Sequence, residues 1–97
     1  MDVEAIIDKI RNAEDVTLKP IADIVALKIS KGPYDGKPEN NLIKAEKITA
    51  EYISENYSTL EEFYESVPES GEGIKGIQTC ADAIYQYYTD SDRLSFD

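Results

Sequence analysis

Apolar side chains recur along this chain at the three- and four-residue spacing of an α-helix, and no stretch alternates apolar and polar residues for long. The second apolar segment carries such residues on more than one face, which predicts that it forms the most buried helix. We therefore expect an all-α fold, a compact bundle of about five short helices. The spacing places these helices over residues 3–12, 17–29, 41–56, 58–66 and 77–88.

Local signals set the expected ends of these helices. Asp2 is a good N-cap for the first helix. Ser58 followed by Glu61 has the spacing of a capping box, which predicts that Ser58 starts the fourth helix. Two segments rich in glycine and other turn-forming residues, 31–41 and 67–76, are expected to be loops.

The length of 97 residues is enough for one domain with a single modest core. We expect one helical domain over residues 1–97, with 1–90 folded and 91–97 forming a flexible tail. No apolar run approaches the length that spans a membrane, and the residues after Met1 do not have the pattern of a signal peptide. These features favour a cytoplasmic protein without a membrane partner.

Negative charge is concentrated in one half of the chain. Residues 1–48 contain nine acidic and eight basic residues, whereas residues 49–97 contain eleven acidic residues and only Lys75 and Arg93 as bases. The formal net charge of the whole chain is -10. Such asymmetry suggests that the C-terminal half either faces a basic partner or solvates itself.

Few residues are candidates for catalysis or metal binding. The chain has no histidine and one cysteine, Cys80, which excludes intrachain disulfides, zinc clusters and histidine-based catalysis. The acids at 61–65 are spaced as a solvated helix face, and the Asp-Ser-Asp sequence at 90–92 lacks the glycine and terminal glutamate of a calcium loop. We therefore expect no catalytic residue, no metal and no cofactor.

The order of the helical segments is similar to a known family. A helix ends in Ala-Leu-Lys-Ile, a turn with glycine follows, and a later Ile-Lys-Gly-Ile leads into a helix that ends in an aromatic pair. This order resembles the tandem helix-hairpin-helix domain of bacterial NAD-dependent DNA ligases. The resemblance implies a non-catalytic module within a DNA-processing complex of the ligase or repair kind. The matching stretches are residues 26–29, 44–58, 59–62, 74–77 and 81–88.

The resemblance also implies which residues contact DNA. In that family, hairpin glycines let backbone N–H groups approach DNA phosphates at a helix N-terminus. By position, the phosphate contacts here are Gly32 in the first hairpin and Gly76 and Ile77 in the second. Lysines add positive charge around the first hairpin: Lys28, Lys31, Lys37, Lys44 and Lys47. Acids that would repel phosphate surround the second hairpin and favour a structural role for it: Glu69, Glu72 and Asp82.

An alternative function comes from the acids and tyrosines of the C-terminal half. Three tyrosines of the last helix cannot all face inward, so at least one of them should be exposed. An exposed tyrosine among carboxylates is typical of a protein-binding surface, because the ring supplies contact area and the acids steer a basic partner. The alternative is a small acidic inhibitor, immunity protein or nucleic-acid mimic. Its candidate contacts are Glu61, Glu62, Glu65, Glu69, Glu72, Tyr85, Tyr87 and Tyr88.

Overall fold

Helices make up the regular structure of this protein. The computed structural model describes residues 2–12, 17–31, 38–67 and 74–90. These described residues contain no strand, and the prediction of an all-α bundle is confirmed. The elements in these ranges are α1 (Val3–Arg11), α2 (Leu18–Lys31), α3 (Pro38–Asn56), α4 (Leu60–Ser66) and α5 (Ile74–Asp90).

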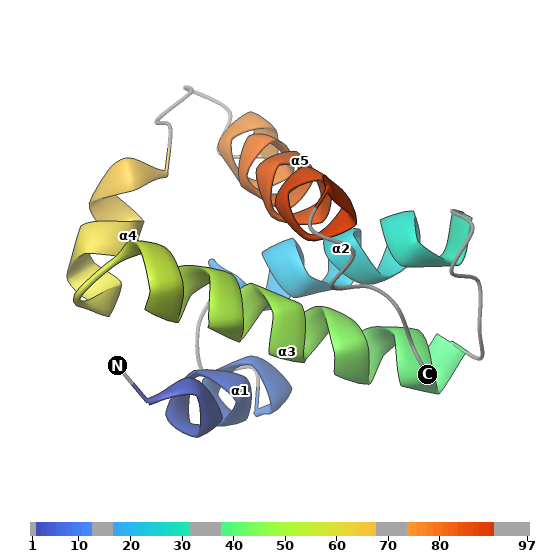
Figure 1. The fold of residues 1–97 in the computed structure, drawn as a ribbon, viewed down its shortest axis with the longest axis horizontal. Coiled ribbons are helices and arrows are strands. Elements are labelled where there is room, and N and C mark those ends of the chain that lie inside the picture. Colours follow the sequence, from blue (N-terminus) through green and yellow to red (C-terminus); the bar gives the residue numbers. More distant parts are fainter. Residues whose placement is uncertain (1, 13–16, 32–37, 68–73, 91–97) are drawn as a thin grey trace.

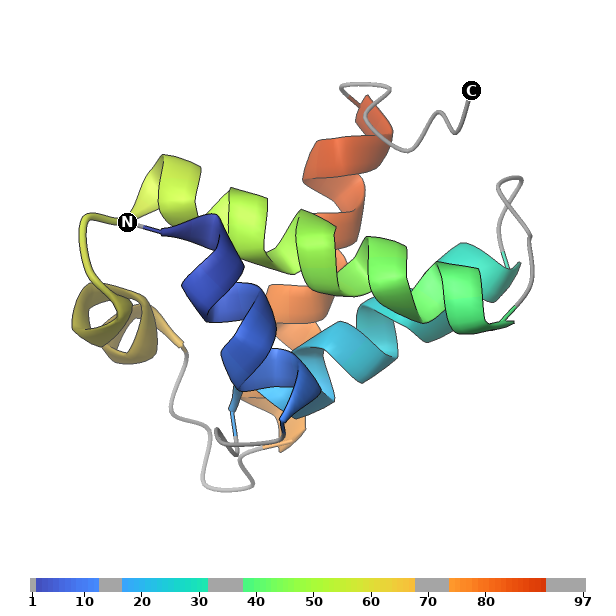
Figure 2. The same ribbon diagram turned by 90° about the horizontal axis from the view of Figure 1, so that it is seen from below.

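The two central helices are α2 and α3. In Figure 1, α3 crosses the middle of the molecule, with α1 on one side and α5 on the other. Seen from below in Figure 2, α2 lies beside α3 and runs in the opposite direction. Each of the two contacts both α1 and α5. The helix that we expected to be most buried, α2, therefore shares the centre of the molecule with α3.

An apolar core fills the space between the helices. Its members recur three or four residues apart, because such positions line one face of a helix. Phe63 and Tyr88 are its largest side chains and are 1% and 0% exposed. The Cα radius of gyration is 12.5 Å, close to the ~13 Å expected for a compact domain of ~100 residues. The core contains Ile6, Ile7, Ile10, Leu18, Ile21, Ala22, Val25, Ile29, Ala45, Ile48, Ala50, Ile53, Phe63, Ala81, Ile84 and Tyr88.

The buried polar side chains of the described residues all belong to α3. Glu46 is 3% exposed, and its Oε1 accepts a hydrogen bond from Nε of Arg11 in α1 at 2.9 Å. This hydrogen bond, and then the charge of Glu46, raise the pKa of Arg11. Asn41 is 2% exposed, and its Nδ2 donates a hydrogen bond to Oγ of Ser30 in α2 at 2.9 Å. The third buried polar side chain is that of Thr49. Because buried polar groups are costly without partners, the two hydrogen bonds fix how α1 and α2 sit on α3.

Two helices begin three residues earlier than the sequence pattern predicts. α3 begins at Pro38 rather than at 41, because the fixed φ of proline suits the first position of a helix, where its missing N–H is not needed. α5 begins at Ile74 rather than at 77, so Gly76 lies inside the first turn and is buried. Packing outweighs the cost of about 1 kcal/mol that a glycine adds to a helix interior. α5 also continues to Asp90, two residues beyond its predicted end.

The start of α4 also differs from the prediction. Thr59, not Ser58, is the N-cap, because Oγ1 of Thr59 accepts a hydrogen bond from the N–H of Glu62 at 3.2 Å. Oε2 of Glu62 in turn accepts a hydrogen bond from the N–H of Ser58 at 3.0 Å. A reciprocal pair of the capping-box kind is therefore present one residue later than the predicted pair of Ser58 and Glu61.

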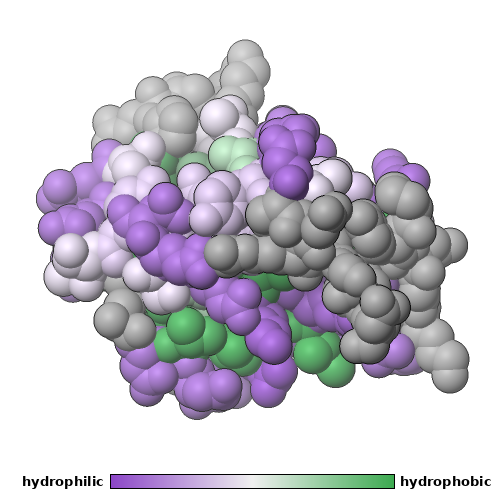
Figure 3. Space-filling view, in the orientation of Figure 1, coloured by the Kyte–Doolittle hydropathy of each residue, from purple (hydrophilic) through white to green (hydrophobic). Residues whose placement is uncertain are grey.

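The surface is mostly hydrophilic in the view of Figure 3, where hydrophobic residues emerge mainly along the seam between α1 and α3. The exposed large hydrophobic side chains among the described residues are Leu27, Ile43 and Tyr87, which are 54%, 51% and 38% exposed. Within the described ranges, no helix is both long enough and apolar enough to cross a membrane. The predicted tail, 91–97, lies outside the described residues.

Candidate functional site

The lysines of the predicted first hairpin lie at the C-terminal end of α2. Lys28 forms an ion pair with Asp82 of α5, and 35% of its side chain is exposed. Lys31 is exposed at the last position of the helix. Gly32 and Lys37 lie outside the described residues. Lys28 is therefore turned towards α5, where a carboxylate balances its charge.

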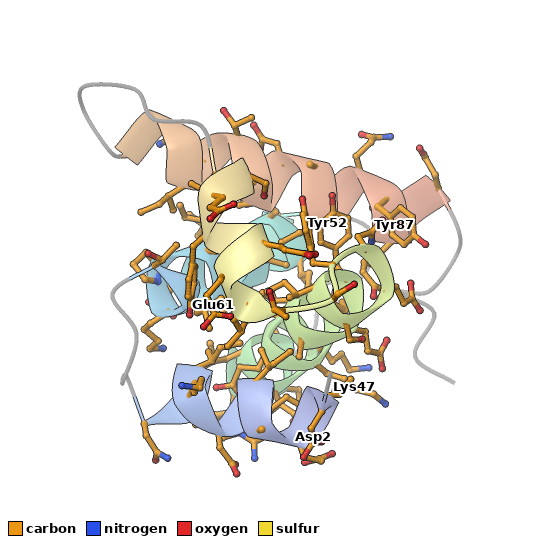
Figure 4. The ribbon with its side chains drawn as sticks, turned by 90° about the vertical axis from the view of Figure 1, so that its left-hand side faces the viewer. Asp2, Lys47, Tyr52, Glu61 and Tyr87 are labelled. Atoms are coloured by element: carbon orange, nitrogen blue, oxygen red, sulfur yellow. The ribbon has the colours of Figure 1, made fainter. Side chains whose placement is uncertain are left out.

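Lys44 and Lys47 project from α3 rather than from α2. Lys44 is half-buried, and burial, together with the nearby charge of Lys47, lowers the pKa of Lys44. Lys47 is exposed, with its Nζ 4.0 Å from Oε1 of Glu51. Figure 4 shows Lys47 on the side of α3 where α1 lies, whereas Lys28 pairs with α5. The lysines therefore do not gather on one face around a turn.

Gly76 and Ile77 do not form the turn that the resemblance implies. Both lie in the first turns of α5, where Gly76 is buried and Ile77 is packed against the apolar core. The prediction of a turn at these residues is wrong, because α5 begins before them, at Ile74. A phosphate contact through their backbone N–H groups loses the exposed geometry that it requires.

Acids of the alternative binding surface lie on α4. Glu61, Glu62 and Glu65 are exposed, and the helix carries no basic side chain. Glu61 and Glu65 are four residues apart and therefore share one side of α4. Glu69 and Glu72 lie outside the described residues. Within the described chain, α4 thus presents carboxylates without a compensating cation of its own.

The three tyrosines of α5 have three different environments. Tyr87 is 38% exposed, Tyr85 is half-buried and Tyr88 is 0% exposed. The prediction that at least one of them is exposed is confirmed. The prediction that Tyr88 contacts a partner is wrong, because Tyr88 continues the inward face of α5 that Ala81 and Ile84 form at helical spacing. It is a core residue and has no surface to offer a partner.

Tyr87 reaches α3 and meets two residues that the sequence analysis did not select. Its ring lies edge-on to Tyr52, with the ring centroids 5.5 Å apart and an angle of 76° between the ring planes. Its hydroxyl donates a hydrogen bond to Oε2 of Glu55 at 3.2 Å. Tyr52 and Glu55 are three residues apart, so their shared side of α3 was visible in the sequence. Only the packing of α5 on α3 shows what lies opposite them.

We call Tyr52, Glu55 and Tyr87 the tyrosine–glutamate face. Figure 4 views the molecule with α4 in front. It shows Tyr52 and Tyr87 together between α3 and α5, whereas Glu61 lies on the other side of α4 in this view. Residues 49–90, which contain this face, include nine acidic residues and one basic residue, Lys75. The face therefore belongs to the strongly negative part of the chain.

Two titratable groups at this face, Tyr52 and Cys80, favour their neutral forms. Burial raises the pKa of Tyr52, and its neighbours Tyr57, Cys80 and Tyr87 add smaller effects in the same direction. Burial also raises the pKa of the Cys80 thiol, which lowers the fraction of reactive thiolate at neutral pH. The described residues contain no group of three or more His, Cys, Asp or Glu placed to hold a metal ion.

Comparisons with known proteins add no assignment to this surface. Neither protein-family models, nor curated proteins, nor solved structures give a match to this chain. The resemblance to the ligase domain stays a prediction that depends on the residues quoted for it above. The function is therefore inferred from the chemistry of the surface.

Proposed function

We propose that this protein is a non-catalytic binding module that docks on a basic protein through the tyrosine–glutamate face. The observation that carries the proposal is the contact of Tyr87 with Tyr52 and Glu55, which holds a partly exposed aromatic ring beside a carboxylate. Tyrosine is favoured at binding surfaces because it supplies a large contact area at a low cost in conformational entropy. The surrounding acids would steer a basic partner and accelerate its association.

The positions of the lysines support this function over direct contact with DNA. Lys28 is paired with Asp82, and Lys47 belongs to a different side of the molecule. A protein that grips phosphates needs a basic face, whereas the net charge of this chain is -10. Contact with the DNA backbone, as the ligase-like reading implies, is therefore the weaker of the two proposals.

Fluorescence anisotropy with two probes tests the proposal: a labelled oligolysine peptide, and labelled duplex DNA in nicked and intact forms. Two double variants each remove two exposed negative charges. Glu55→Gln/Asp90→Asn changes Glu55 of the tyrosine–glutamate face and Asp90, which is three residues after Tyr87 on α5, whereas Glu4→Gln/Asp8→Asn changes α1 and serves as the matched control. We expect oligolysine to bind the unaltered protein, with a several-fold loss in the first double variant and little loss in the second.

Three results would contradict the proposal. The first is the absence of oligolysine binding even at low salt, where charge pairing is strongest. The second is an equal loss in both double variants, which would mean that total charge, rather than this face, holds the peptide. The third is salt-sensitive DNA binding that Lys28→Glu/Lys31→Glu abolishes, which would favour the helix-hairpin-helix function instead.

A further inference from the structure

Tyr87 is the most exposed ring in a small cluster of tyrosines where α5 meets α3, within the described residues. Its ring centroid lies 5.5 Å from that of Tyr52 and 5.2 Å from that of Tyr88, and both contacts are edge-on, at 76° and 75°. Tyr88 is fully buried and Tyr52 is packed against the core. The ring of Tyr87 is therefore packed against one buried and one half-buried ring, while 38% of the residue faces solvent.

Two carboxylates flank this ring. Glu55 of α3 accepts the hydroxyl hydrogen bond of Tyr87 at 3.2 Å, and it is exposed. Asp90 is exposed three residues after Tyr87 on α5, on the same side of the helix, and its Oδ1 accepts a hydrogen bond from Nε2 of Gln86 at 2.8 Å. A carboxylate has two oxygens and about four acceptor positions. Both of these acids are exposed, so their negative charges are within reach of a basic side chain of a partner.

A ring with a carboxylate at its edge suits a guanidinium better than an ammonium. The guanidinium is planar and weakly hydrated, so it can lie on an aromatic ring and still present two parallel N–H donors to a carboxylate. The ammonium of lysine is a compact, strongly hydrated charge and pairs with either group as a point charge. The arrangement at Tyr87 and Glu55 therefore discriminates between the two basic side chains.

We propose that the tyrosine–glutamate face seats an arginine of the basic partner, with its guanidinium on the ring of Tyr87 and paired with Glu55. The proposal rests on the function proposed above, and it names the anchoring side chain. Charge complementarity supports a basic occupant, since residues 49–90 carry nine acids against Lys75. The chain's own Arg11 is held by Glu46 on the α1 side of the molecule, so a second copy does not supply this arginine from α1.

The test compares two labelled peptides of equal length and charge, one with arginines and one with lysines at the same positions, by fluorescence anisotropy in ~150 mM NaCl. A cation–π contact at a surface site changes affinity by about two- to five-fold, so we expect the arginine peptide to bind tighter by this factor. Tyr87→Ala should bring the two affinities together. Tyr87→Phe keeps the ring and should keep the difference in affinity between the two peptides. The control variant Leu27→Ala, which alters an exposed side chain of α2, should change neither affinity.

The possible outcomes separate this inference from the proposed function. Equal binding of both peptides, together with weaker binding of both to Glu55→Gln/Asp90→Asn, overturns the arginine assignment and leaves docking through the face in place. An arginine preference that persists in Tyr87→Ala also overturns the assignment, because the ring is then not the seat. Failure of both peptides to bind overturns the arginine assignment and the proposed function together. Circular dichroism of each variant checks that the helices are intact.

Discussion

The side chain of Thr59 sets the start of α4. Its hydroxyl accepts the N–H of Glu62, while the carboxylate of Glu62 accepts the N–H of Ser58. These two hydrogen bonds satisfy backbone donors at a helix N-terminus, where no intrahelical acceptor exists. α4 has 7 residues, fewer than an isolated helix needs for stability in water. The cap and the buried ring of Phe63 therefore supply much of what holds this helix.

We predict that Thr59→Ala lowers the free energy of unfolding by about 1 kcal/mol, because the N–H of Glu62 loses its acceptor. Ser58→Ala is the matched control and should change this free energy by less than about 0.5 kcal/mol, since Ser58 contributes its N–H and not its hydroxyl. Urea unfolding followed by circular dichroism measures both. Equal losses in the two variants would contradict the assignment of the cap to Thr59.

At the scale of the elements, α2 shows how packing divides one apolar helix into covered and uncovered sides. Ile29 and Leu27 are two residues apart, and they are 0% and 54% exposed. α3 and α5 cover two sides of α2 and bury Ile29, whereas the side that carries Leu27 faces solvent. Side chains two residues apart on a helix point in different directions, so a helix with apolar residues on several faces need not be buried all round.

We predict that Ile29→Ala lowers the free energy of unfolding by about 2–5 kcal/mol, because it removes buried methyl groups and leaves a cavity. Leu27→Ala should change it by no more than about 0.5 kcal/mol, because much of the side chain is already in water. Thermal or urea unfolding of the two variants gives the comparison. A loss in Leu27→Ala as large as that in Ile29→Ala would mean that the side of α2 with Leu27 is covered.

At the scale of the whole molecule, the bundle joins a nearly neutral half of the chain to a strongly acidic half. The ion pair of Lys28 with Asp82 connects the two halves through α2 and α5. A net charge of -10 disfavours the compact state through self-repulsion. Raising the pH removes further protons and makes this charge more negative.

We predict that stability falls as the pH rises from about 8 to about 11. Burial raises the pKa of Cys80 above its ordinary value of 9.0 and that of Tyr52 above 10.0. Above these ordinary values, the unfolded chain has released protons that the folded protein still holds. Because the unfolded state then binds fewer protons than the folded state, the free energy of unfolding decreases as the pH rises. The stabilisation from these two groups is complete below their ordinary pKa values and is lost as the pH rises through their raised pKa values in the folded protein.

Urea unfolding at a series of pH values measures this effect. The double variant Cys80→Ala/Tyr52→Phe removes both groups, so its stability should fall less steeply with pH than that of the unaltered protein. Added salt should reduce the part of the stability loss that comes from repulsion between like charges. Salt screens repulsion between exposed groups and acts less on buried ones. An identical pH slope in the double variant would contradict the assignment to Cys80 and Tyr52.

Much of the fold was predictable from local signals, and part of the candidate site was too. The helical spacing of apolar residues predicted the five helices of the described residues, and Asp2 was correctly expected to cap α1. The exposure of one tyrosine in α5 followed from helix geometry alone. The early start of α5 at Ile74 was not predictable, because the glycine at 76 signals a turn unless tertiary packing outweighs its cost.

The sequence by itself determined the helical class, the acidic C-terminal half and the supply of tyrosines and glutamates, because these depend on composition and on the period of a helix. Only the tertiary structure decided that Tyr87 meets Tyr52 and Glu55, that Tyr88 is core, and that Lys28 faces Asp82. These are contacts between helices, and they depend on how α5 crosses α2 and α3. Many local interactions define a helix, whereas the crossing results from the packing of the whole core.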